Sequence, residues 1–225
     1  MLNLRKNSLL LIMMIALILL TGCLNKQTPI EKMYEVLEKV VSTEKLFEEQ
    51  QDPLVLLEKK EKDIYEKIIS LGMKEAEEIS KLSDEALVVI EERKEHMKKE
   101  QESIEASKKE FETLSPLIED LDKPDQKEKA EQLYEIMMER YSIYEEQYEY
   151  YTNALRLDKE LYEMFKEEDQ QIDQLQEQIT KINEEYNKLQ KANELFNEKT
   201  KQYNDLKLSF YKYTGIEVNV EDGRK

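Results

Sequence analysis

The stretch IDQLQEQITKINEEYNKLQ, residues 172–190, carries the most regular apolar pattern in the chain. Its apolar residues recur in alternating steps of three and four, which places them in one stripe along an α-helix that packs against other helices. The stripe continues beyond the quoted residues and comprises Ile172, Leu175, Ile179, Ile182, Tyr186, Leu189, Phe196, Tyr203 and Phe210. The pattern predicts a long helix with coiled-coil-like packing.

Three earlier segments carry stripes of the same kind. With the last one, they cover about residues 30–71, 74–121, 125–167 and 171–213. At 1.5 Å per residue, each spans roughly 60–72 Å. Equal lengths and short connections are what an antiparallel bundle requires. The sequence therefore predicts an all-α fold, an elongated antiparallel bundle of three to four long helices.

Short signals indicate where the helices begin and end. Thr28, followed by Pro29 and Glu31, matches a capping box with proline at the first helical position. Pro53 is expected to kink or break the first helix, and Pro116 to kink or stop the second one near its end.

The connection between the last two segments leaves two possibilities. One helix from 125 to 213 would be about 130 Å long, with little to cover its apolar stripe. Alternatively, the wholly polar residues 166–171 form a turn in which Asp169 caps a new helix. The matched lengths of the segments favour the turn.

The second segment has polar residues at four positions of its apolar stripe. These seam positions are Ser83, Arg93, Glu100 and Ser107. A seam that is polar at these positions is expected to be loosely packed in its middle.

The N-terminal residues follow the layout of a secretory signal peptide. Arg5 and Lys6 precede an apolar run of twelve residues, which the small residues Thr21 and Gly22 close. As a helix this run rises only ~18 Å, which is too short to span a membrane.

The cysteine that follows is the only one in the chain. Leu20, Thr21, Gly22 and Cys23 resemble the lipobox of bacterial lipoproteins, in which the cysteine sulfur receives a diacylglyceryl group and the chain is cut just before it. The alternative is an ordinary signal peptide with an incidental cysteine. The lipobox interpretation divides the chain into a signal peptide (1–22), a short membrane tether (23–28), a helical bundle (29–214) and a C-terminal tail (215–225).

The charge of the chain limits its partners. Removal of residues 1–22 changes the formal charge from -17 to -19, with 32 basic against 51 acidic residues. Such a chain is repelled by nucleic acid and by other polyanions, so nucleic-acid binding is excluded.

One candidate binding face stands out in the third segment. Tyr141, Tyr144, Tyr148 and Tyr151 share a helix face, and aromatic faces can stack on sugar rings. The alternative is that these tyrosines lie in the seam of the bundle, with their hydroxyl groups reaching water at its edge.

Catalytic, metal and cofactor sites are not expected. The single histidine, His96, has Arg93 three residues before it, so the Glu-x-x-His pair of di-metal bundles is missing. The sequence contains no Gly-rich phosphate loop, no Gly-x-Ser-x-Gly and no His-Glu-x-x-His.

The chain resembles the YkyA-like family of cell-wall-binding lipoproteins of Bacillus and its relatives over essentially its full length. The residues that carry the resemblance are the lipobox, Glu31-Lys32-Met33-Tyr34, Glu139-Arg140-Tyr141 and the closing Leu208-Ser209-Phe210-Tyr211-Lys212. The resemblance implies a lipoprotein of a Gram-positive cell envelope that binds the cell wall, with no catalytic residues to assign.

We therefore expect a non-catalytic lipoprotein, held by its lipid at the extracytoplasmic side of the cell membrane, that binds peptidoglycan or an envelope protein. The alternative is an envelope adapter or chaperone that binds other proteins through its helical surface. A solute-capturing protein of a transporter would need alternating strands and helices, and this sequence does not predict them.

Overall fold

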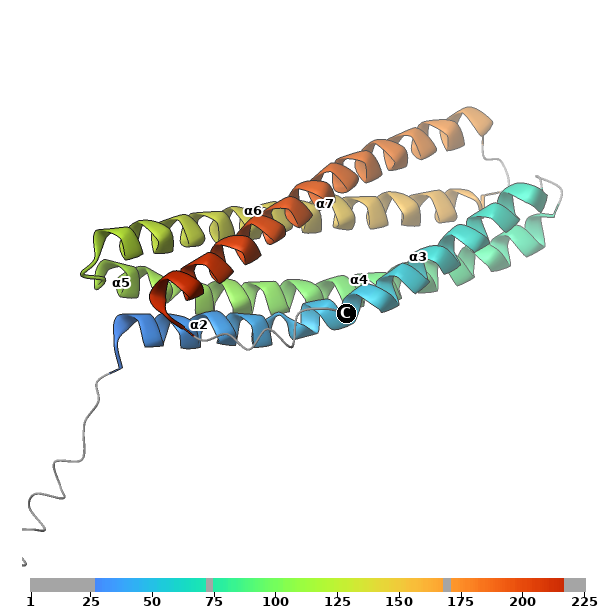
Figure 1. Cartoon of the computed structure of the whole chain (residues 1–225). Coiled ribbons are helices and arrows are strands. Elements are labelled where there is room, and N and C mark those ends of the chain that lie inside the picture. Colours follow the sequence, from blue (N-terminus) through green and yellow to red (C-terminus); the bar gives the residue numbers. More distant parts are fainter. Residues whose placement is uncertain (1–26, 72–74, 168–170, 217–225) are drawn as a thin grey trace, which may run out of the picture.

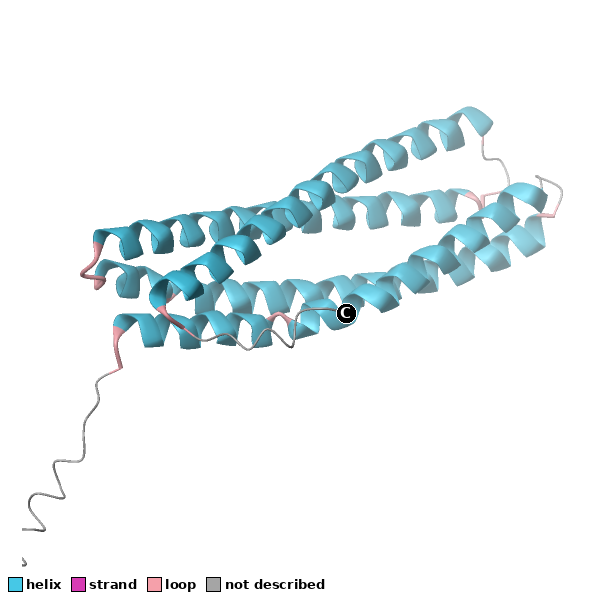
Figure 2. Ribbon diagram, in the orientation of Figure 1, coloured by secondary structure: helices cyan, strands magenta, loops and turns pink. Residues whose placement is uncertain are grey.

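The computed structural model describes residues 27–71, 75–167 and 171–216. In these ranges the chain forms helices and no strands, as predicted (Figure 2). The helices are α2 (Pro29–Thr43), α3 (Lys45–Leu71), α4 (Ala76–Glu112), α5 (Leu114–Glu119), α6 (Pro124–Met164) and α7 (Ile172–Thr214). None of these helices combines the length and hydrophobicity that crossing a membrane requires.

The long helices form two antiparallel hairpins, α3 with α4 and α6 with α7 (Figure 1). The hairpins meet where α4 packs on α6, while α2 and α5 complete the bundle at one end. In Figure 1, α3 and α7 run alongside each other toward the opposite end, where α3 ends and α7 begins, and almost no backbone contact joins them. The bundle is closed at the α2 end, where Tyr211 of α7 packs against Tyr34 of α2, whereas α3 and α7 do not pack backbone to backbone.

The hydrophobic core follows this arrangement. At the closed end one cluster draws on α2, α4, α5, α6 and α7 and includes Met33, Phe111, Tyr141 and Phe210. Farther along, the core divides into a larger cluster centred on α3, α4 and α6 and a small one around Leu157, Leu161 and Ile182.

Most of the predicted helix ends are observed. Thr28 caps α2, because its hydroxyl accepts from the Glu31 N–H at 3.2 Å and the Glu31 carboxylate accepts from the Thr28 N–H at 2.7 Å. The helix before Pro116 is interrupted at Thr113, about one turn before this proline, which has no N–H to continue the helical hydrogen bonding. The last two long helices are separate, since α6 ends at Met164 and α7 begins at Ile172; Asp169 itself lies outside the described residues.

The predicted break at Pro53 is misplaced. Helix α3 runs through Pro53, and the chain instead leaves the helix at Glu44. Ser103 of α4 supports this earlier break, because its hydroxyl donates to the Thr43 carbonyl at 2.7 Å and accepts from the Phe47 N–H at 3.2 Å. A side chain from another helix thus satisfies backbone groups that the break leaves open.

Candidate functional site

A groove runs along the side of the bundle between α3 and α7. Its floor comes from α4 and α6 and its walls from α3 and α7, and it has a volume of about 990 Å³. On α7 its lining extends from Ile179 to Thr200, which corresponds to ~32 Å of helix. The groove is long and open, because the backbone packing between the two hairpins is mainly that of α4 on α6.

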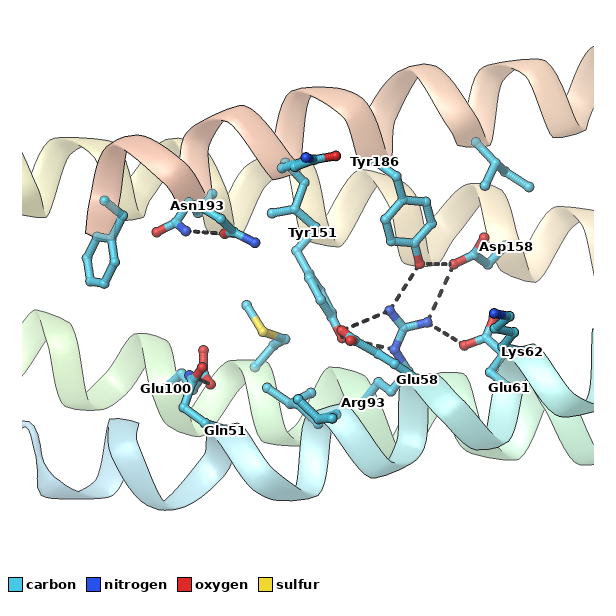
Figure 3. A pocket seen from close by; sticks show the side chains of 18 of the residues that line it. Gln51, Glu58, Glu61, Lys62, Arg93, Glu100, Tyr151, Asp158, Tyr186 and Asn193 are labelled. Atoms are coloured by element: carbon cyan, nitrogen blue, oxygen red, sulfur yellow. Dashed lines mark hydrogen bonds and ion pairs between the residues drawn. The ribbon is translucent and has the colours of Figure 1, made fainter. Parts of the chain in front are cut away.

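Arg93 of α4 lies at the centre of a polar cluster in this groove (Figure 3). Its side chain is 2% exposed, and it pairs with Glu61 of α3 and lies 3.6 Å from an Asp158 oxygen of α6. Its Nε donates to the Tyr151 hydroxyl at 2.9 Å and its Nη2 to the Tyr186 hydroxyl at 3.0 Å. One guanidinium group thus joins all four long helices.

The tyrosine hydroxyl groups connect the Arg93 cluster to further carboxylates. Tyr151 donates to Glu58 at 2.9 Å, and Tyr186 donates to Asp158 at 2.6 Å. Three carboxylates therefore surround one permanent positive charge. Burial raises the pKa of Glu61 to about 7 against the opposing effect of Arg93, and burial likewise raises the pKa of Asp158.

These contacts correct the expectation of a loose seam in the second segment. Ser83, Arg93, Glu100 and Ser107 are all buried. Ser107 hydrogen-bonds the Tyr141 hydroxyl at 2.7 Å and donates to Glu44 at 2.8 Å. Three of these four polar residues make specific contacts to other helices, so the seam is polar rather than loose.

A second section of the groove, the amide section, lies toward the closed end and comprises Gln51, Glu100, Tyr144, Gln147 and Asn193. Gln51 donates to the Glu100 carboxyl group at 2.5 Å, and Gln147 donates to the Asn193 side-chain oxygen. Glu100 is 3% exposed and pairs with no cation in the described part of the chain. Burial, with the nearby Glu58 charge, raises the pKa of Glu100 to about 8.

Arg140 of α6 lies at the closed end of the groove and is already neutralised. Its Nη1 and Nη2 pair with the two Glu44 oxygens at 2.8 and 2.9 Å, and its Nε donates to Thr200 at 2.8 Å. The guanidinium carbon also lies 4.5 Å from the centre of the Phe196 ring. Arg140 therefore offers little free positive charge to an anionic ligand.

The four tyrosines of the predicted binding face do not form an exposed surface. Tyr141, Tyr144 and Tyr151 are at most 5% exposed, and Tyr148 is partly buried against the core. Their stripe faces the other helices, where Tyr141 packs against Phe111 and Tyr144 against Phe47 and Phe196. Tyr144 and Tyr151 line the groove, whereas Tyr141 and Tyr148 are not part of its lining.

Other predicted site residues fall outside this geometry. Leu20, Thr21, Gly22 and Cys23 lie outside the described residues. His96 is on the outer face of the α3–α4 hairpin, where its Nδ1 lies 2.7 Å from the Gln50 side-chain oxygen. Within the described ranges, no group of three or more His, Cys, Asp or Glu side chains is arranged to hold a metal ion.

Sequence reasoning did not identify Glu61, Asp158, Gln147 or Asn193 as groove residues. A signal for the first two was present, because Glu61 occupies an apolar-stripe position between Leu57 and Ile64, and Asp158 occupies the equivalent place before Leu161. An arginine and two acids at stripe positions of three different helices are a pattern that buried ion pairs produce.

The comparison with known proteins agrees with this fold. The family model YkyA, described as "Putative cell-wall binding lipoprotein", matches residues 28–213. The chain belongs to the YkyA family. Within the YkyA family, the uncharacterized lipoprotein YkyA of Bacillus subtilis (strain 168) is 37% identical over 201 residues, which are 89% of this chain and 90% of the relative.

A crystal structure of a conserved Staphylococcus aureus protein of unknown function shares the fold of this YkyA-family chain. The two superpose with a TM-score of 0.72, covering 83% of this chain and 92% of the other, at 17% identity. The likeness establishes a common helical architecture.

Proposed function

We propose that this YkyA-family protein is a non-catalytic surface lipoprotein that binds cell-wall material in the groove between α3 and α7. The family description supports the wall-binding role. The groove carries the proposal, because a long open channel lined by tyrosines, amides and carboxylates is suited to a segment of a linear polymer.

The proposed anchor is the lipid on Cys23, at the outer face of the cytoplasmic membrane. Each buried methylene of an acyl chain stabilises attachment by ~0.8 kcal/mol, so two or three chains make the attachment effectively permanent. A bundle ~65 Å long on a tether of at most ~20 Å brings the groove within reach of the inner wall.

Replacement of Cys23 by alanine is expected to abolish lipid attachment, because the chain has no other cysteine to receive it. Metabolic labelling with palmitate and cell fractionation measure the effect. The native protein is expected to carry label in the membrane fraction, whereas the Cys23→Ala protein carries none. Equal labelling of both proteins would contradict the anchor.

Wall binding is tested by retention of the mature protein, purified in detergent, on purified peptidoglycan with and without EDTA. Because the mature protein is strongly acidic, direct contact with anionic wall polymers is disfavoured. We therefore expect retention that survives removal of anionic polymers and is insensitive to EDTA. Loss of retention in EDTA would indicate bridging by divalent cations, and no retention under either condition would discard wall binding.

A second candidate function, an envelope adapter that binds proteins, is favoured by a different surface. The outer aliphatic patch, made of Pro53, Leu56, Leu57, Leu87 and Val88, lies on the α3–α4 hairpin away from the groove. Leu56 is 67% and Val88 56% exposed, and exposed aliphatic patches commonly mark protein interfaces. Crosslinking in cells from this patch would capture a protein if the adapter function is correct.

A further inference from the structure

We propose that the amide section of the groove binds an uncharged glycan segment that carries acetamido and hydroxyl groups. This inference rests on the proposed wall-binding function and specifies the class of ligand. Three features of the amide section support it independently of one another: its hydrogen bonding, its charge and its apolar lining.

The hydrogen bonding of Gln147 indicates a ligand that donates hydrogen bonds. Gln147 is 9% exposed, and its amide nitrogen donates to Asn193, but its side-chain oxygen has no partner among the described residues. A buried carbonyl oxygen without a donor costs about 1–3 kcal/mol. Gln147 lines the groove, so when its side chain turns toward the groove, an N–H or O–H group of a bound ligand can supply the missing hydrogen bond.

The charge of the amide section disfavours an anionic ligand. Arg140 is neutralised by Glu44 at one end, and Arg93 is surrounded by carboxylates at the other. Between them, the acceptors and donors are amides, a phenol, the exposed Glu48 carboxylate and the Glu100 carboxyl group, whose raised pKa keeps it mostly protonated at neutral pH. An anionic ligand would find no free cation among these groups.

The apolar lining of the same section matches sugar rings. Leu54, Met97 and Phe196 line the groove beside the amides. A pyranose ring has weakly polar faces and hydroxyl groups around its edge, so the apolar side chains can contact its faces while the amides bond its edge. The methyl of an acetamido group is apolar as well, and its N–H is a donor of the kind that Gln147 lacks.

The experiment uses the mature protein in detergent and a short soluble oligomer of N-acetylglucosamine, with affinity measured by calorimetry at high salt. A deacetylated oligomer of the same length and an uncharged peptide are the comparison ligands. High salt screens the general attraction of the acidic protein for the cationic deacetylated oligomer. We expect the acetylated oligomer to bind roughly tenfold more tightly than either comparison ligand.

Two variants test the residues. Gln147→Leu removes the unpaired oxygen and is expected to weaken binding of the acetylated oligomer roughly tenfold. Asn193→Ala, at an exposed position that folding tolerates, is expected to weaken it severalfold. The matched control is Gln132→Leu on the exposed face of α6, which is expected to change nothing.

The outcomes separate this inference from the proposed function. If the acetylated oligomer does not bind, or binds Gln147→Leu as tightly as the native protein, while peptidoglycan still retains the protein, the ligand class is wrong and wall binding stands. Tight binding of the peptide alone would also overturn the glycan assignment. Failure of both oligomer binding and peptidoglycan retention would remove the proposed function itself.

Discussion

Replacement of Arg93 by methionine is expected to lower the free energy of unfolding by about 3–5 kcal/mol at neutral pH. The side chain is 2% exposed and is the only cation that pairs with the buried Glu61 and Asp158 in the described part of the chain. Without it, these carboxyl groups must be protonated or remain buried as unpaired charges. Chemical denaturation followed by far-UV circular dichroism measures the change.

A combined variant separates the loss of the ion pairs from the loss of packing. Arg93→Met together with Glu61→Gln and Asp158→Asn removes the charges of all three groups, and we expect it to recover most of the lost stability. The control is Arg156→Met, which removes an exposed arginine paired with Glu160 and is expected to change stability by less than about 0.5 kcal/mol. An equally small effect of Arg93→Met would show that the Arg93 cluster does not hold the hairpins together.

Replacement of Glu100 by glutamine is expected to stabilise the protein by about 2–4 kcal/mol near pH 9, with little effect near pH 4. The pKa of Glu100 is about 8 in the folded protein and about 4.3 in an unfolded chain. Between these values the folded state binds more protons than the unfolded state, so the stability of the native protein falls as the pH rises and levels off above about 8. Glutamine imitates the protonated side chain and removes the part of this fall that Glu100 causes.

Measurement of the free energy of unfolding across this pH range checks the prediction. The pKa of Glu61 is about 7, so the loss of stability that Glu61 causes levels off about one pH unit below that of Glu100. The Glu100→Gln protein still shows the loss that Glu61 causes. Glu102→Gln, on the exposed face of the same helix, is the matched control and should leave the native pH profile unchanged. A Glu100→Gln profile parallel to the native one would contradict a buried, unpaired Glu100.

Local patterns in the sequence were sufficient to predict most of the fold. The all-α bundle, the capping box at Thr28, the interruption before Pro116 and the separation of α6 from α7 all follow from spacing, capping chemistry and length. The break at Glu44 could not be predicted in this way, because Ser103 supports it from another helix. A proline removes one backbone hydrogen bond from a helix. In this chain, contacts with another helix determine where the helix is interrupted.

The candidate site was less predictable, because it depends on contacts between residues that are far apart in the chain. The sequence showed Arg93 and Glu100 as polar seam positions, but not that Glu61, Asp158 and Tyr186 meet Arg93 from three other helices. Likewise, the tyrosine stripe was visible, but whether it lies inside or outside the bundle depends on which helices cover it. Helix pairing therefore determines the groove.

The most direct test of groove binding is photo-crosslinking in living cells, with a photoreactive residue at Asn193 in the groove or, as the comparison, at Leu56 in the outer aliphatic patch. Asn193 lines the groove, and Leu56 is exposed on the opposite hairpin face. We predict that Asn193 captures peptidoglycan glycan and that Leu56 does not. Capture of protein alone from Asn193, or of glycan from Leu56 only, would contradict wall binding in the groove.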